Sequence, residues 1–128
     1  MKRQLTEPPV AMAINVPETY FTEGEGMLKR RRAFEQYYEA MGTEVLPDGC
    51  FYHFIGNIPV HDLLDVYVCY LGFVRYRARI AGFIRNGHAP YPDSPKRNYI
   101  ITTGPVVKAP DGLVMRGFRN FRYCQHLF

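Results

Sequence analysis

Three arginines spaced two residues apart are the first candidates for chemistry in this sequence. Arg75, Arg77 and Arg79 alternate with apolar residues shortly after a glycine at position 72. In an extended strand, residues two apart point to the same face and lie roughly 6.5 to 7 Å apart. That distance is close to the spacing of successive phosphates along a nucleic-acid strand, so the row predicts contacts to a phosphate backbone. The alternative is structural, because alternating arginines also keep the wet face of a sheet soluble and guard its edge.

A second basic stretch, near the end of the sequence, mixes cations with aromatic rings. Its arginines recur at intervals of three and are Arg116, Arg119 and Arg122. The interleaved aromatic residues include Phe118 and Phe121. A cation beside a ring suits single-stranded or flipped bases, because the cation meets phosphate while the ring stacks on the base. The alternative is that the rings belong to the core and the arginines pair with nearby carboxylates.

A third candidate is the loop that follows the first expected strand. Asn15, Pro17, Glu18 and Tyr20 bring amide, carboxyl and aromatic groups to one junction between a strand and a helix. Such a junction can read the hydrogen-bonding edge of a base, although loops also need polar residues for capping. We expect Thr102, from a later strand, to face the same pocket.

Familiar catalytic and metal-binding patterns are absent from the sequence. It has no nucleophile-elbow serine, phosphate-binding loop, zinc-protease motif or zinc-deaminase motif. The histidines share no metal-ligand spacing, and His53, in an aromatic strand, is expected to be a hydrogen-bonded core residue. Cys50, Cys69 and Cys124 lack C-x-x-C spacing, which favours reduced structural thiols over a disulfide or a zinc site. The sequence therefore argues against an enzyme, and we expect no cofactor and no metal.

The composition indicates one basic domain. A length of 128 residues, 47% of them hydrophobic, suffices for a single core, which we place at residues 10–128 after a flexible lead-in at residues 1–9. The 16 Lys and Arg exceed the 12 Asp and Glu, which favours a polyanionic partner such as RNA or DNA. No apolar run is long enough for a membrane span, and the first residues lack the apolar core of a signal peptide. We expect a cytoplasmic protein that does not bind membranes, with a homo-oligomer left open.

A central hairpin at residues 65–83 is expected to position the arginine row. Its first strand is apolar on both faces, which is typical of a strand inside a sheet. A tight turn is predicted at Leu71 and Gly72, because glycine can take the positive φ that such a turn needs. After the turn, Val74, Tyr76 and alternate residues fall on the face opposite the arginines.

The remaining elements predict a mixture of one helix and several strands. We expect a strand at Val10–Val16, a helix at Met27–Met41 from its helical apolar spacing, and a strand at Cys50–Ile55. A long surface loop is predicted over residues 84–98, followed by a strand at Asn98–Lys108 interrupted at Gly104-Pro105. The run from Lys29 to Arg32 lies early in the helix, where it is either a solvated face or, at Lys29, a contact to nucleic acid. The predicted fold class is α+β, a small mixed or antiparallel β pseudo-barrel with one main helix after the first strand.

Four stretches together resemble the PUA-like superfamily, the small pseudo-barrels that include the ASCH, EVE and YTH domains. These stretches are V-A-M-A-I-N-V-P, L-L-D-V-Y-V-C-Y-L-G, F-V-R-Y-R-A-R-I-A-G-F and Y-I-I-T-T-G-P-V-V-K, which span most of the chain. The resemblance implies a module that binds RNA or DNA and holds a base, modified in the EVE and YTH branches, in an aromatic-lined pocket. Asn15, Pro17 and Tyr20 would then lie at the pocket mouth. The sequence departs from the pattern in having no Trp and no G-x-K-x-x-E motif.

The leading hypothesis is thus a nucleic-acid-binding module that holds one base or nucleotide and secures phosphates with arginines. Two alternatives remain open. One is a small hydrolase on the same scaffold, acting on a nucleoside-like substrate with Glu18 and Lys29 as acid and base groups. The other is a protein-interaction domain with an exposed apolar patch.

Overall fold

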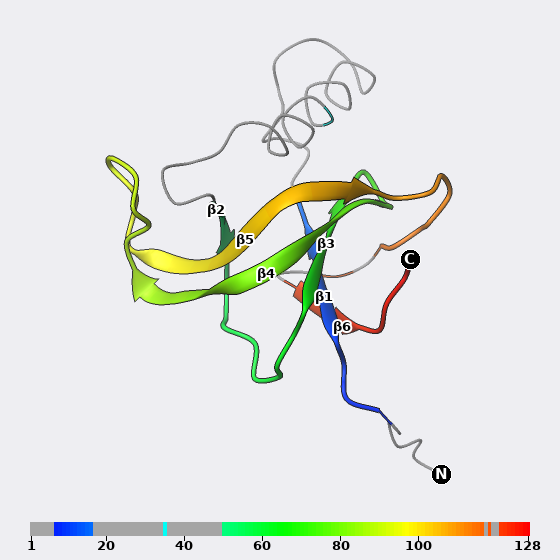
Figure 1. The fold of residues 1–128 in the computed structure, drawn as a ribbon, viewed down its shortest axis with the longest axis horizontal. Coiled ribbons are helices and arrows are strands. Elements are labelled where there is room, and N and C mark those ends of the chain that lie inside the picture. The colour runs from blue at the N-terminus through cyan, green and yellow to red at the C-terminus, as the bar shows by residue number, and fades with distance from the viewer. Residues whose placement is uncertain (1–6, 17–34, 36–49, 117, 119–120) are drawn as a thin grey trace.

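A single six-stranded sheet organises the protein. We describe a computed structural model, which places residues 7–16, 35, 50–116, 118 and 121–128. The strands are β1 (Ala11–Asn15), β2 (Cys50–Ile55), β3 (Asp65–Tyr70), β4 (Phe73–Gly87), β5 (Arg97–Lys108) and β6 (Phe121–Cys124). Their order across the sheet is β2-β5-β4-β3-β1-β6 (Figure 1).

The sheet is mixed, and its longest strands form a ribbon. β1 pairs with β3 in parallel, whereas β1–β6, β3–β4, β4–β5 and β2–β5 are antiparallel. Figure 1 shows β4 and β5 running together as a long curved ribbon that extends well beyond β3 and β1. β2 pairs with the Asn98–Thr103 part of β5, whereas β3 pairs with the Phe73–Arg79 part of β4. The two ends of the ribbon therefore have different neighbouring strands.

Strand β3 is buried along its whole length because apolar groups cover both faces of the sheet. One face carries a core cluster that includes Met12, Val66 and Ile100. The other face carries a second cluster built around Ala13 and Tyr67. The sequence pattern of β3, apolar on both sides, predicted this interior position, and the burial of all six of its residues confirms it.

The predicted fold class is wrong. Among the described residues Glu35 alone is helical and the named elements are all strands, and the linear strand order leaves β2 and β6 as separate edges, so the sheet is open and not a pseudo-barrel. A barrel closes only when its first and last strands pair. The helix predicted at Met27–Met41 lies outside the described residues except at Glu35. Within the described ranges, no helix has the length and apolar content needed to cross a bilayer.

The polar stretch after the hairpin is more regular than its composition suggests. A loop was predicted over residues 84–98, but β4 continues to Gly87 and β5 begins at Arg97, which leaves a shorter connection. Pairing to a neighbouring strand overrides the low strand propensity of Asn and Gly here. The strand was predicted to be interrupted at Gly104-Pro105, but β5 continues through these residues, and only its register with β4 shifts there.

The predicted turn between β3 and β4 is also confirmed. Leu71 has φ 53° and Gly72 has φ 82°. Two successive positive φ angles give the hairpin a twist that matches its strands. The turn sets the pairing of Tyr70 with Phe73, and a shift of register between Val68 and Cys69 then places Asp65 opposite Arg79.

Replacing the turn glycine should destabilise the hairpin. We expect Gly72→Ala to lower the free energy of unfolding by about 1 kcal/mol, because an L side chain at positive φ is strained. A Cβ at this position would also lie 3.0 Å from Nε of Arg116. The matched control is Gly82→Ala, whose added Cβ would lie 3.9 Å from Cδ1 of Ile101, an ordinary contact. Urea denaturation measures both, and equal losses would contradict the backbone argument.

Candidate functional site

The arginine row lies on β4, as predicted, but its guanidinium groups bind other parts of the protein. Nε of Arg79 lies 3.2 Å from Oδ1 of Asp65. Nε of Arg75 donates a hydrogen bond of 3.1 Å to the carbonyl of Tyr70, and its Cζ lies 4.9 Å from the centre of the Phe73 ring. Both arginines therefore make contacts within the protein, which fits the alternative that the row has a structural role.

The middle arginine holds the last residues of the sequence. Arg77 donates a hydrogen bond to the main-chain oxygen of Phe128, and its guanidinium lies 5.0 Å from the centre of the Phe128 ring. The hydroxyl of Tyr67 donates to the same oxygen at 3.3 Å and accepts a hydrogen bond of 2.7 Å from the main-chain nitrogen of Leu127. His126 adds a contact of 3.1 Å from Nε2 to Oδ2 of Asp65. The segment 126–128 therefore packs over the face that carries the arginine row.

Of the residues predicted to share a base pocket, the structure describes Asn15 and Thr102, and these two lie apart. Asn15 is exposed at the end of β1, whereas Thr102 is only 1% exposed on β5. Two strands, β3 and β4, separate β1 from β5, so the strands that carry the two residues are roughly 14 Å apart. The residues are also offset along the sheet, because Asn15 is level with Val74 of β4 and Thr102 pairs with Ile80. Pro17, Tyr20 and Lys29 lie outside the described residues, as does Glu18.

Thr102 instead supports the buried interior through a histidine. Oγ1 of Thr102 and Nε2 of His53 are 3.3 Å apart. Burial lowers the pKa of His53 to about 4, so the imidazole is neutral at physiological pH. The expected hydrogen bond of His53 is confirmed, and its side chain is partly buried.

The terminal basic stretch is also divided among different surroundings. Arg116 lies beside the hairpin turn at Gly72, and Arg122 lies on β6 opposite Ala13. Phe118 and Phe121 pack against different core clusters, one on each face of the sheet. Arg119 lies outside the described residues. The described rings therefore follow the core alternative, while Arg116 and Arg122 remain exposed.

A hollow formed by described residues is too small for a base. It lies near the turn after β5 and is lined by residues that include Phe73, Arg75, Lys108 and Asp111. The volume open to water there is about 20 Å³. Such a volume holds roughly one water molecule, whereas small-molecule sites enclose several hundred Å³.

The two described thiols whose pKa values shift are unsuited to nucleophilic chemistry. Cys69 and Cys124 are both free. Burial raises the pKa of Cys69 to about 12 and that of Cys124 to about 11. Because the thiolate is the reactive form, both groups are inert at neutral pH, as expected of structural thiols. Among the described residues, no group of three His, Cys, Asp or Glu side chains could hold a metal ion.

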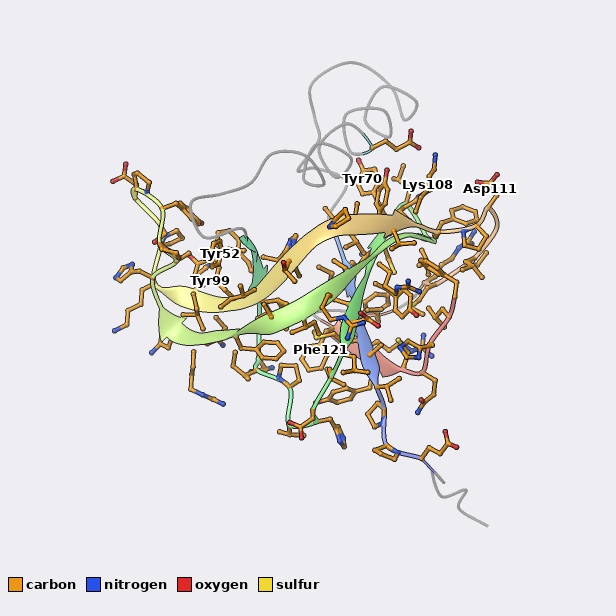
Figure 2. All side chains as sticks on the ribbon, in the orientation of Figure 1. Tyr52, Tyr70, Tyr99, Lys108, Asp111 and Phe121 are labelled. Atoms are coloured by element: carbon orange, nitrogen blue, oxygen red, sulfur yellow. The ribbon has the colours of Figure 1, made fainter. Side chains whose placement is uncertain are left out.

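A cluster of aromatic rings at the far end of the sheet offers a different site. We call it the aromatic platform, and its members are Tyr52, Phe54, Tyr91, Arg97 and Tyr99. The rings of Phe54 and Tyr99 lie 5.3 Å apart, and those of Tyr52 and Tyr91 lie 6.3 Å apart. Cζ of Arg97 lies 4.7 Å from the centre of the Phe54 ring. Figure 2 shows Tyr52 and Tyr99 at one end of the ribbon, far from Tyr70, Lys108 and Asp111 at the other.

Strand pairing brings these rings onto one face. Phe54 on β2 lies directly opposite Tyr99 on β5, so both side chains point to the same side of the sheet. Tyr52 and Arg97 join that face because each is two residues from one of this pair. His53, between Tyr52 and Phe54, points to the opposite face toward Thr102.

The loop between β4 and β5 supplies Tyr91 and is tied down by hydrogen bonds. The main-chain nitrogen of Tyr91 donates to the carbonyl of Ala89 at 2.9 Å, and the hydroxyl of Ser94 donates to the same carbonyl at 2.6 Å. The hydroxyl of Tyr99 donates to the carbonyl of Pro95. Burial, and after it a hydrogen bond with Tyr91, raises the pKa of Tyr99. The loop therefore holds Tyr91 close to the strand residues.

Arg97 of the aromatic platform and the preceding Lys96 have no acidic partner in the described chain. Lys96 and Arg97 are both exposed. No described Asp or Glu forms an ion pair with either of them, and this includes Asp93 in the same loop. Their charges therefore face solvent and are available to an anion.

The sequence contained part of the signal for this site. Alternation within Cys50–Ile55 places Tyr52 and Phe54 on one face, and residues 84–98 were predicted to form a long surface loop, a kind of segment that often carries function. The pairing of β2 with β5, which joins the two segments, is not visible in the sequence. None of the five platform residues was therefore among the predicted site residues.

Comparisons with known proteins add no relative. No family model, no curated protein and no solved structure matches the chain.

Proposed function

We propose that the protein is a nucleic-acid-binding module whose phosphate contacts lie beside the aromatic platform. The observation that carries the proposal is the guanidinium of Arg97 stacked at 4.7 Å on a Phe54 ring that is itself 42% exposed. Exposed rings next to unpaired cations are the combination by which proteins bind nucleic-acid strands.

The charge distribution supports this proposal over a role for the arginine row alone. Arg75 and Arg77 donate to main-chain oxygens, and Arg79 contacts a buried carboxylate. Lys96 and Arg97 have no such acidic partners among the described residues, so a phosphate would not have to displace a carboxylate. The excess of basic residues over the whole sequence would also speed the approach of a polyanion.

The proposal covers RNA and DNA, and it allows two ways of binding a base. In the first, suggested by the PUA-like resemblance, a pocket holds the base, and Asn15, Pro17 and Tyr20 would line its mouth. Asn15 is the member of this set that the structure describes. The platform version needs no pocket, because a base can stack on an open ring.

Salt-dependent binding tests the proposal. Fluorescence anisotropy with short RNA and DNA oligonucleotides should show affinity that falls linearly, on logarithmic axes, between about 50 and 200 mM salt. Replacing both platform cations (Lys96→Gln with Arg97→Gln) should reduce the slope by about 1 to 2 and weaken binding across all sequences. The matched control is Lys108→Gln, an exposed cation at the opposite end of the ribbon (Figure 2).

Two results would overturn the proposal. One is the absence of binding to any oligonucleotide at low salt. The other is an equal loss from Lys108→Gln and from the double variant, which would mean that total charge and not the platform governs binding.

A further inference from the structure

We infer that the aromatic platform recognises unpaired bases, so that the ligand is single-stranded nucleic acid and not duplex. This inference rests on the proposed function, because it assigns the substrate class of the same site. The proposed phosphate contacts need only the cations, whereas this inference assigns the aromatic rings the role of stacking on bases.

Two stacking positions are present on the platform. The first is Phe54, with 42% of its surface exposed and with Arg97 over the ring. The second is Tyr91, with 36% exposed and with Tyr52 beside it. Tyr52 and Phe54 lie two residues apart on one face of β2, roughly 6.5 to 7 Å along the strand. Tyr52 thus links the two stacking positions, because it is two residues from Phe54 on β2 and its ring lies 6.3 Å from that of Tyr91.

The rings are held in place before any ligand binds. Tyr99 is fully buried and packs its ring 5.3 Å from that of Phe54. Its hydroxyl is held by the carbonyl of Pro95, and Tyr91 is held through Ala89. Rings with few free torsions lose little entropy on binding, which favours their use as contacts.

The exposure of these rings selects against duplex. In a duplex each base face is covered by its neighbours, so a protein ring reaches a base face only where the stack is open. Phosphate contacts from Lys96 and Arg97 would be available to either form. A guanidinium such as that of Arg97 can also lie parallel to a base while its charge faces phosphate. The ring contacts are therefore gained only with an unpaired strand.

A comparison of three ligands separates base stacking from phosphate binding. The wild-type protein is titrated with a single-stranded oligonucleotide, with its duplex, and with an abasic strand of the same length. We expect the single strand to bind more tightly than the other two. We expect Phe54→Ala to weaken single-strand binding about 5- to 100-fold and to leave binding of the abasic strand unchanged. Phe54→Tyr, which keeps the ring, should bind the single strand within about 2-fold of wild type.

The controls cover folding and general loss of apolar surface. Val107→Ala removes a side chain on β5 that is 44% exposed, close to the 42% of Phe54, and should leave all three affinities unchanged. Thermal denaturation checks that Phe54→Ala is folded. If it is not, Tyr91→Ala serves in its place, because it removes a ring from the loop and leaves the sheet unchanged. Tyr91→Ala should also weaken binding of the single strand.

The outcomes distinguish the two proposals. If the wild-type protein binds all three ligands equally, or if neither ring substitution affects the single strand, the platform inference is wrong while nucleic-acid binding stands. If no ligand binds at low salt, both are wrong. A single-strand preference that is lost with the Phe54 and Tyr91 rings, and kept in Val107→Ala, establishes the inference.

Discussion

Lowering the pH from 6.5 to 4 should cost the protein about 2 to 3 kcal/mol of unfolding free energy through His53 alone. Burial lowers the pKa of this imidazole from 6.5 in the unfolded chain to about 4 in the fold. Between these values the unfolded state binds a proton that the folded state does not, so stability falls as the pH falls. Above pH 6.5 both states are neutral, and below about pH 4 both are charged, so the loss develops between these limits. The side chain keeps some contact with water, which moderates the loss.

The measurement is urea denaturation at several pH values for wild type and for His53→Gln. The variant should lack the His53 contribution, so its stability should fall less steeply over this range. His88→Gln is the control, because His88 is exposed and its ring contacts the carbonyl of Ser94 on the surface. A His53→Gln curve parallel to wild type would show that this imidazole is not buried as a neutral group.

Local features of the central hairpin could be predicted from the sequence because short-range rules determine them. Alternation set the opposite faces of Arg77 and Tyr76, and the glycine at position 72 marked the turn. The continuous apolar run marked β3 as interior. Each of these depends on neighbours within a few residues, where strand period and turn chemistry apply.

The partners of the arginines could not be predicted because they depend on long-range pairing. Asp65 meets Arg79 through the hairpin register, which a single-residue slip would change. The oxygen that Arg77 contacts belongs to Phe128, far away in the sequence. The same limit hid the aromatic platform, whose Phe54 and Tyr99 meet only through β2–β5 pairing. The spacing of the three arginines along the strand therefore predicts the positions of their guanidinium groups, but not the groups that they bind.

The fold class was wrong for a related reason. The prediction treated one helical apolar pattern as a main element of the fold, whereas strands determine the architecture of the described residues. β4 has 15 residues and β5 has 12, and both are longer than their predicted counterparts. Their pairing carries them past β3 and β1, so β2 adds to the far end of the ribbon and the sheet stays open.

Removing Arg79 should destabilise the protein more than removing its partner Asp65. The side chain of Asp65 is 8% exposed, and that of Arg79 is 59% exposed. Without Arg79, a buried carboxylate keeps only the contact of 3.1 Å to Nε2 of His126, and we expect a loss of about 2 to 3 kcal/mol, since an unpaired buried charge is poorly solvated. Without Asp65, both Arg79 and His126 remain hydrated, and we expect a loss of about 1 kcal/mol.

A double-mutant cycle tests this asymmetry. Arg79→Ala, Asp65→Ala and the double variant are compared by urea denaturation. The double variant should be more stable than Arg79→Ala, because it no longer buries a carboxylate that has lost its arginine partner. If Arg79 instead served chiefly to bind phosphate, Arg79→Ala would leave stability unchanged and weaken oligonucleotide binding. That result would mean that the arginine row binds nucleic acid, and it would contradict the assignment of phosphate contacts to the aromatic platform instead.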